Sequence, residues 1–146
     1  MKQVSFAMLL CLFSVISFGQ SDKESMSELI KENFDFAAKQ YQYMMTLLPS
    51  GMTPQSYNEK GDKFVARDIK WWCSGFYPGS LWYIYEQTGD EAIRKEAERM
   101  LEVIKPNETY TGNHDLGFIM YCSFGNAYRI TQKQEYKDII FKSAES

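Results

Sequence analysis

The stretch FYPGSLWYIYEQTGDEAIRKEAERMLEVI, residues 76–104, predicts two helices joined by a tight turn. Residues 76–88 are dense in aromatic and aliphatic side chains, whereas residues 90–104 carry apolar side chains at steps of three and four, with charges between them. Gly89 is suited to end the first helix in a left-handed conformation, and Asp90 to cap the second. A turn this short predicts an antiparallel helical hairpin with a buried inner helix and a half-exposed outer helix.

The same alternation extends to both sides of this hairpin. Helical periodicity is present at 24–48, at 115–130, where the residues are apolar nearly all round, and again from 134 onward. Residues 49–70 are polar and predict a loop long enough to carry function, and no stretch shows a convincing strand pattern. We therefore predict an all-α fold in which inner and outer helices alternate, as in a toroid of helical hairpins. Five helices cannot close such a ring, so we expect an incomplete barrel and an N-terminal fragment of a longer protein.

The first twenty residues differ from the rest of the chain. Lys2 precedes an apolar run from Phe6 to Phe18, and small residues follow near a plausible cleavage point. The run is too short for a membrane span, so residues 1–20 are predicted to be a secretory signal peptide. We expect the mature protein, residues 21–146, to be exported to the periplasm or the extracellular space.

Charge and composition exclude several classes of partner. Removing Lys2 with the signal peptide leaves 15 basic and 19 acidic side chains, a net charge of −4. A mildly acidic chain rarely binds nucleic acid by charge, so neither nucleic acid nor a membrane is an expected partner. With 45% hydrophobic and 16% aromatic residues, the chain has the composition of one globular unit with a sizeable core.

Cysteine and histidine are too sparse to build a metal site. Cys73 and Cys122 remain after cleavage; export permits a disulfide between them, although two distant cysteines are more often unpaired core residues. The chain has one histidine and no CxxC motif, so no zinc site is expected.

The one histidine, His114, stands beside Asp115 where a polar loop turns into a helix, in the sequence GNHDLGF. An aspartate at this point can simply cap the helix by accepting hydrogen bonds from its first amides. The neighbouring histidine adds a second polar side chain at the same end of the loop, and the pair is also consistent with a catalytic role.

A second dense stretch, WWCSGFYPG at residues 71–79, precedes the inner helix. Most of its aromatic residues are expected in the core, but an indole at a junction between loop and helix also suits stacking on a sugar ring. Gly75 and Gly79 leave room for a close neighbour, either another helix or a ligand, and their spacing does not distinguish the two.

Taken in order, these motifs resemble glycoside hydrolase family 88, the unsaturated glucuronyl hydrolases. The resemblance covers about residues 25–146. It rests on four motifs: Trp72, Gly75, Phe76, Pro78 and Gly79; Leu81, Trp82, Tyr85, Glu86, Thr88, Gly89 and Asp90; His114, Asp115, Leu116, Gly117 and Phe118; and Gly125, Asn126, Tyr128 and Arg129.

The resemblance implies an (α/α)6 barrel of six helical hairpins and a substrate class. The substrate would be a lyase-generated oligosaccharide with a 4,5-unsaturated uronic acid at its non-reducing end, of the glycosaminoglycan type. An aspartic acid would protonate C4 of the double bond, water would add at C5, and the hemiketal would open. Neither cofactor nor metal is implied, because carboxyl groups and water suffice for this chemistry.

The resemblance also assigns roles to individual residues. Asp115 resembles the first of two essential aspartates, His114 its neighbour at the uronate, and Trp72 the ring that packs against the sugar. Cys73 stands where threonine is commoner in the family. The second aspartate, the main general acid/base, is expected beyond this chain, because Asp138 lies beside Lys137 on an outer helix. We therefore expect the 146-residue chain alone to be inactive and poorly stable.

Two other interpretations remain open at this point. The neighbouring unsaturated rhamnogalacturonyl hydrolases would use the same barrel and chemistry on pectin fragments. In a non-catalytic helical binding or scaffold module, Trp72 and His114 would only hold sugar or fill the core.

Overall fold

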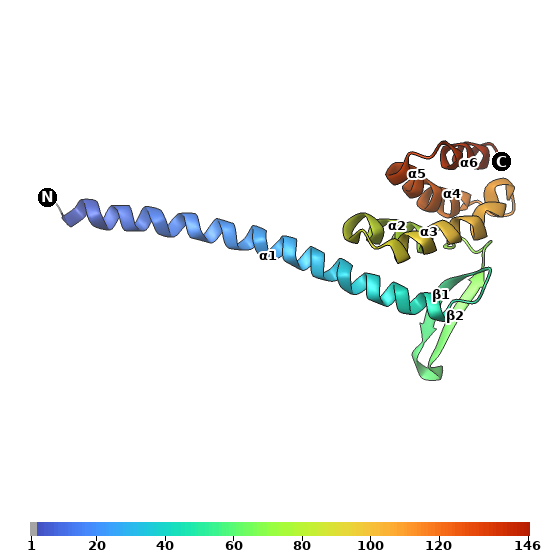
Figure 1. The fold of residues 1–146 in the computed structure, drawn as a ribbon, viewed down its shortest axis with the longest axis horizontal. Coiled ribbons are helices and arrows are strands. Elements are labelled where there is room, and N and C mark those ends of the chain that lie inside the picture. The colour runs from blue at the N-terminus through green and yellow to red at the C-terminus, as the bar shows by residue number, and fades with distance from the viewer. Residues whose placement is uncertain (1–2) are drawn as a thin grey trace. The chain divides into compact units, whose positions relative to one another are not determined.

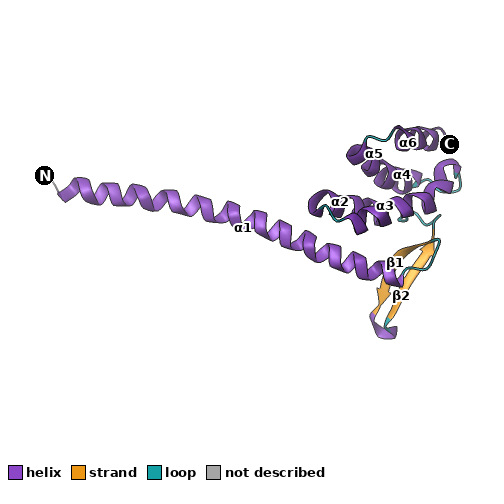
Figure 2. Cartoon of the chain, viewed as in Figure 1, coloured by secondary structure: helices purple, strands orange, loops and turns teal. Residues whose placement is uncertain are grey.

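A computed structural model describes residues 3–146, with side chains from residue 25 onward. The chain forms two compact units, residues 1–36 and 37–146. Its elements in chain order are α1 (Gln3–Leu47), β1 (Met52–Asn58), β2 (Lys63–Asp68), α2 (Phe76–Thr88), α3 (Glu91–Ile104), α4 (Leu116–Met120), α5 (Asn126–Thr131) and α6 (Gln134–Glu145) (Figure 1, Figure 2). Short 3-10 turns, η1 (Glu59–Gly61) and η2 (Lys105–Thr109), and a π-helical turn, η3 (Tyr121–Gly125), complete the set.

The first unit consists of the N-terminal part of α1. The predicted signal peptide, residues 1–20, lies outside the residues whose side chains the structure describes. Among the described helices, none combines the length and apolar character needed to cross a membrane. The predicted helix 24–48 corresponds to the C-terminal part of α1, which ends one residue earlier, at Leu47.

The helical hairpin predicted from residues 76–104 is present. Gly89 adopts φ +67° at the end of α2, and its amide donates to the Tyr85 carbonyl at 2.7 Å. The Asp90 carboxylate accepts from the amides of Ala92 and Ile93 at 2.8 and 3.3 Å, which caps α3. The apolar stripe of α3 is fully buried: Ile93, Ala97, Met100, Leu101 and Ile104.

The helix predicted at 115–130 is divided into α4, η3 and α5, which follow one another without a break. The buried Ser123 hydroxyl, in this π-helical turn, donates to the carbonyl oxygens of Ile119 and Met120. Both α2 and α6 contact this segment. The segment is therefore packed on two sides, and Phe118 and Tyr121 belong to the part of its surface that is exposed.

A β-hairpin occupies residues 52–68, where a loop without strands was predicted. β1 and β2 pair antiparallel from Met52 opposite Asp68 to Asn58 opposite Lys63, with an irregularity between Pro54 and Ser56. Pro54 lacks an amide hydrogen and sits at this bulge, where the ladder tolerates it. The hairpin interrupts an otherwise helical unit.

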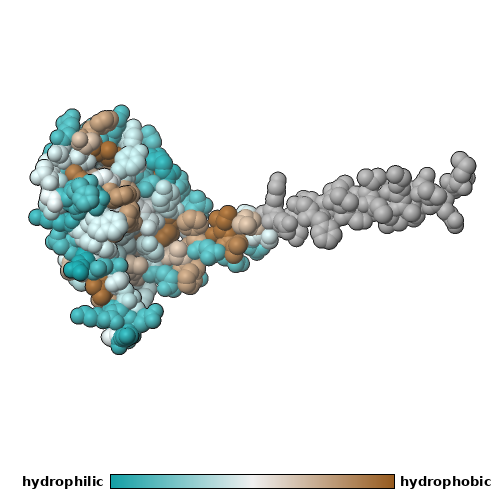
Figure 3. Space-filling view, turned by 180° about the vertical axis from the view of Figure 1, so that it is seen from behind, coloured by the Kyte–Doolittle hydropathy of each residue, from teal (hydrophilic) through white to brown (hydrophobic). Residues whose placement is uncertain are grey.

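Within residues 37–146, the helices stack in layers, with α4 and α5 lying between the α2–α3 hairpin and α6 (Figure 1). The largest fully buried hydrophobic side chains come from α2, α3, α4 and η3, among them Trp82, Met100, Ile119 and Phe124. On the face shown in Figure 3, hydrophobic patches are small and separated by hydrophilic residues. The core therefore lies between the helical layers, and the WWCSG and GNHD stretches directly precede α2 and α4.

Candidate active site

Two glycines bring the WWCSGFYPG stretch against α4. A Cβ on Gly75 would lie 2.1 Å from the carbonyl oxygen of Ile119 and 2.5 Å from that of Phe118. A Cβ on Gly79 would lie 2.5 Å from the carbonyl oxygen of Cys122. The neighbour that both glycines accommodate is thus another helix, which resolves the alternative that their spacing left open.

The loop before α4 is tied to the loop before α2 by two amide side chains. Asn113 Nδ2 donates to the Lys70 carbonyl at 3.4 Å, and the buried Asn107 Nδ2 donates to the Ile69 carbonyl at 2.8 Å. These bonds hold the segment that carries His114 and Asp115 beside the segment that carries Trp72.

Asp115 directly precedes α4, but its carboxylate makes no capping hydrogen bond to the helix. The Asn113 side chain instead accepts from the Asp115 amide at 2.9 Å, and the Asp115 carbonyl accepts from the amide of Phe118 at 2.9 Å. The interpretation of the Asp115 carboxylate as a helix cap is therefore wrong, and its oxygens remain available for other partners.

The Asp115 carboxylate lies beside His114. Its Oδ2 is 3.4 Å from His114 Nε2, and the side chains are 26% and 92% exposed, respectively. A partly buried carboxyl group beside an imidazole can exchange protons with a ligand, and both side chains can bind the ligand's polar groups. Both residues line a recess of about 380 Å³ together with Gly117, Phe118, Tyr121 and Cys122.

Trp72 lies next to this recess rather than in its lining. Its indole is 44% exposed. Its ring meets those of Phe76 and Phe118, each with a centroid separation of 6.1 Å, and Phe118 lines the recess. The structure thus brings together the three predicted site residues, with Phe118 as the link that sequence reasoning did not assign.

The two thiols near the site are free. Burial, and then the negative charge of Asp115, raise the pKa of the Cys73 thiol, and burial raises that of Cys122. Both therefore remain protonated at neutral pH, as neutral neighbours of the acid. Among the described residues, no group of three or more His, Cys, Asp or Glu side chains is placed to hold a metal ion.

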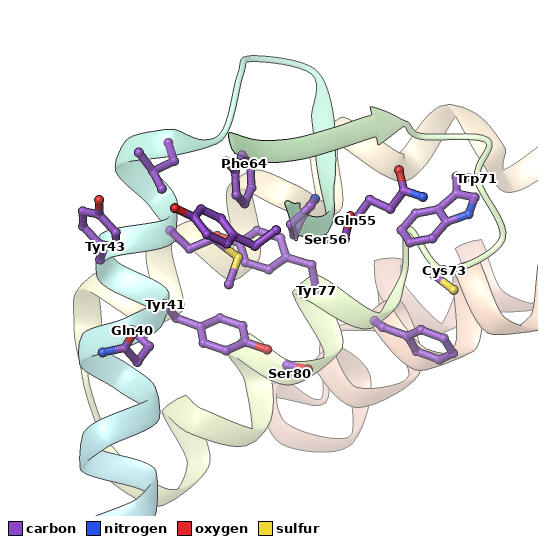
Figure 4. A pocket seen from close by; sticks show the side chains of 15 residues that line it. Gln40, Tyr41, Tyr43, Gln55, Ser56, Phe64, Trp71, Cys73, Tyr77 and Ser80 are labelled. Carbon is purple, nitrogen blue, oxygen red and sulfur yellow. The ribbon is translucent and has the colours of Figure 1, made fainter. Parts of the chain in front are cut away.

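A larger cavity of about 700 Å³ opens between the end of α1, the β-hairpin and the start of α2 (Figure 4). Tyr41 and Tyr77 stack across it with centroids 5.7 Å apart, and Trp71 and Cys73 lie at its far end. Its lining is aromatic, amide, hydroxyl and aliphatic, without a carboxylate, a basic group or the histidine. The sequence did not predict this cavity because the hairpin that forms one wall was not predicted.

Comparison with known proteins bears on this arrangement. No protein-family model matches the chain. An unsaturated glucuronyl hydrolase of Formosa agariphila is 33% identical over 115 residues, which is 78% of this chain and 26% of that protein. One from a Bacillus species is 35% identical over 81 residues, covering 53% and 21%. An unsaturated chondroitin disaccharide hydrolase of Streptococcus pyogenes is 27% identical over 123 residues, covering 81% and 30%.

A solved structure is similar as well. The crystal structure of an unsaturated glucuronyl hydrolase specific for heparin matches with a TM-score of 0.72 and 34% identity, over 79% of this chain and 31% of that one. The layered helices therefore correspond to part of a helical barrel. The chain belongs to the unsaturated glucuronyl hydrolase family. It spans less than a third of the length of the curated relatives it matches.

Proposed function

We propose that these residues form the N-terminal part of an enzyme that removes a 4,5-unsaturated uronic acid from the non-reducing end of lyase-generated oligosaccharides. The observation that carries the proposal is the Asp115 carboxylate, which makes no helix cap and lies beside His114 in a recess. The names of the relatives, which concern unsaturated glucuronyl and chondroitin substrates, support the same substrate class.

In the proposed reaction, a carboxyl group gives a proton to C4 as the double bond breaks. A water oxygen bonds to C5, and the water proton passes to a carboxylate, which restores the balance of protons. The resulting hemiketal opens and releases the remaining sugar. No residue of the chain is consumed in these steps.

Asp115 is the one acid that lines the recess among the described residues. We propose that Asp115 acts with a second carboxyl group, that His114 binds the uronate, and that Trp72 stacks on the sugar. Asp138 is not that second group in this proposal, since its carboxylate accepts from Gln134 on α6. The 146-residue chain alone is accordingly expected to show little turnover.

The test is a turnover assay of the full-length protein with unsaturated disaccharides made by chondroitin, heparin and pectin lyases. Ultraviolet absorbance follows the conjugated double bond, which disappears on hydration. Turnover of chondroitin or heparin products supports the proposal, whereas turnover of pectin products alone would identify an unsaturated rhamnogalacturonyl hydrolase. Binding without turnover of any product would favour a sugar-binding module.

We also propose that the protein is exported. The support is the apolar run from Phe6 to Phe18 after Lys2, followed by small residues. Amino-terminal sequencing of the mature protein is expected to begin near residue 21. A mature protein that retains Met1 would overturn this proposal.

A further inference from the structure

Three aromatic rings meet at the edge of the acid recess: Trp72, Phe76 and Phe118. The centroids of Trp72 and Phe76 are 6.1 Å apart at 85°, and those of Trp72 and Phe118 are 6.1 Å apart at 68°. The rings of Phe76 and Phe118 are 5.9 Å apart at 55°. The two pairs that involve Trp72 are therefore edge-on, a geometry that aromatic pairs prefer, and the pair of phenylalanines is tilted. We call these three residues the aromatic triad.

Trp72 lies in the turn before α2, so its own backbone belongs to no helix or strand. Two of its ring contacts, Trp71 and Phe76, come from nearby in the chain and belong to the same turn and the start of α2. Phe118 contacts it from α4, the helix that follows the acid. Of the ring contacts to Trp72, this one relates the indole to the segment that carries Asp115.

The backbone of Phe118 is held on two sides. Its amide donates to the Asp115 carbonyl at 2.9 Å, which fixes its distance from the acid. Its own carbonyl oxygen lies 2.5 Å from where a Cβ on Gly75 would be, so α2 approaches it closely. A ring on this backbone has little freedom to shift relative to either the acid or α2.

The side chain of Phe118 is nevertheless 48% exposed and lines the recess. A large exposed apolar ring contributes less to stability than a buried one, because much of its surface stays in water. Its placement thus suits a role at the mouth of the site better than a role in the core.

We propose that Phe118 is a positioning residue that holds the Trp72 indole at a set distance and angle from the Asp115 carboxylate. The placement of the ring follows from the structure alone, whereas its use in sugar binding rests on the proposed function. Phe118 acts through Trp72, so its removal lets the indole turn and separates the stacking surface from the acid.

The first test needs no substrate. Fluorotryptophan is incorporated into the full-length protein, and the fluorine signals of Trp72 and Trp82 are assigned from their loss in Trp72→Phe and Trp82→Phe variants. Phe118→Leu is expected to shift or broaden the Trp72 signal and to leave that of the fully buried Trp82 unchanged. Phe118→Tyr, which retains the ring, should restore the wild-type signal. Phe141→Leu removes another exposed ring, on α6, as a matched control.

The second test measures sugar affinity. The probe is the unsulfated unsaturated disaccharide from chondroitin lyase, titrated against the labelled full-length protein in an Asp115→Asn background, which prevents turnover during the titration. Phe118→Leu is expected to weaken binding roughly three- to tenfold, the range that one aromatic pair supplies. In a Trp72→Ala background, the same change should have almost no further effect, because the residue it acts through is gone.

The outcomes of these two tests distinguish the positioning role of Phe118 from the proposed sugar substrate. An unchanged Trp72 signal in Phe118→Leu, or equal losses of affinity with and without Trp72, would overturn the positioning role. A shift of the Trp82 signal as well would indicate general unfolding and would also count against it. If the full-length protein neither binds nor turns over the disaccharide while the Trp72 signal still depends on Phe118, the proposed substrate fails and the ring placement stands.

Discussion

The two sides of α2 are built differently. Toward α4 and α5, Gly75 and Gly79 allow backbone contact, and Arg129 on α5 forms a two-pronged ion pair with Glu86 at 2.6 and 2.8 Å. Toward α1 and the β-hairpin, large aromatic side chains keep the elements apart and leave a cavity of about 700 Å³. We call the side of α2 toward α4 and α5 the closed side, and the side toward α1 and the β-hairpin the open side. The closed side holds the acid recess, whereas the cavity on the open side is lined by no charged side chain.

This difference indicates where chemistry is feasible. A proton transfer needs a titratable group held within fractions of an ångström, and backbone contact through glycines provides such rigidity. The larger cavity offers stacking surfaces and neutral hydrogen-bonding groups, which can bind a ligand but cannot exchange a proton with it at neutral pH. By this criterion the smaller recess, and not the larger cavity, is the candidate for proton-transfer chemistry.

The largest effect is expected from Asp115→Asn, which tests the closed side as the site of chemistry. Replacing a general acid or base lowers turnover by about 10²- to 10⁴-fold. Stability should change by less than about 0.5 kcal/mol, because the carboxylate caps no helix. The measurements are turnover of the full-length protein and urea denaturation. Asp138→Asn, the same change on α6, should retain near-normal turnover, and equal losses in both variants would remove Asp115 from the mechanism.

Gly75→Ala is expected to disrupt the close backbone contact between Gly75 and α4 on the closed side. Its added Cβ would meet the carbonyl oxygen of Ile119 at 2.1 Å, and a backbone atom can yield only if the helices separate. We expect a loss of about 3 kcal/mol, at the upper end for overpacking. Gly117→Ala is the control, because a Cβ there meets nothing within 4 Å. Thermal denaturation of both variants gives the comparison, and similar melting temperatures would contradict the close approach.

Tyr77 lines the cavity on the open side of α2, and its substitution tests the packing there. Its hydroxyl donates to Glu96 Oε1 at 3.2 Å, while Arg99 binds the same carboxylate at 2.7 Å. Burial, and then the charge of Glu96, raise the pKa of the Tyr77 phenol far above its ordinary value, so the hydroxyl remains a donor. Tyr77→Phe is expected to cost about 1 kcal/mol, since Glu96 keeps Arg99.

The control for this change is Tyr83→Phe, which removes a hydroxyl from an exposed position on the same helix. Urea denaturation should place Tyr83→Phe within about 0.5 kcal/mol of the wild type. If the two variants lose the same stability, the buried bond to Glu96 contributes nothing specific.

The sequence predicted those features that depend on helical periodicity and on local capping residues. The ends of α2 and α3 followed from Gly89 and Asp90, because a left-handed glycine and a capping carboxylate act within one turn of the chain. The same local rule failed at Asp115, where Asn113 supplies the loop bond and the helix starts without a side-chain cap. The Phe118 amide, which a capping carboxylate could bind, donates instead to the Asp115 carbonyl, so the residue type at this position did not by itself predict a cap.

Features that depend on tertiary context were not predictable. The strands at 52–58 and 63–68 contain a proline and few alternating apolar residues, so pairing between them, not pattern, defines the hairpin. The π-helical turn at 121–125 likewise left no periodic signal. The link between Trp72 and Phe118 needed the spatial meeting of two motifs that lie 46 positions apart.

The smallest effect concerns the ion pair on the closed side, Glu86–Arg129. The hydrogen bond from Arg129 holds the pKa of Glu86 below its ordinary value of 4.5. The pair therefore stabilises the fold above that value, and its contribution is lost as the pH falls through the lowered pKa of the folded state. Because both side chains are partly exposed, the contribution is below about 1 kcal/mol. Urea denaturation of Glu86→Gln should show this deficit at neutral pH and none in strong acid, whereas a deficit that persists in acid would mean that packing, not charge, joins α2 to α5.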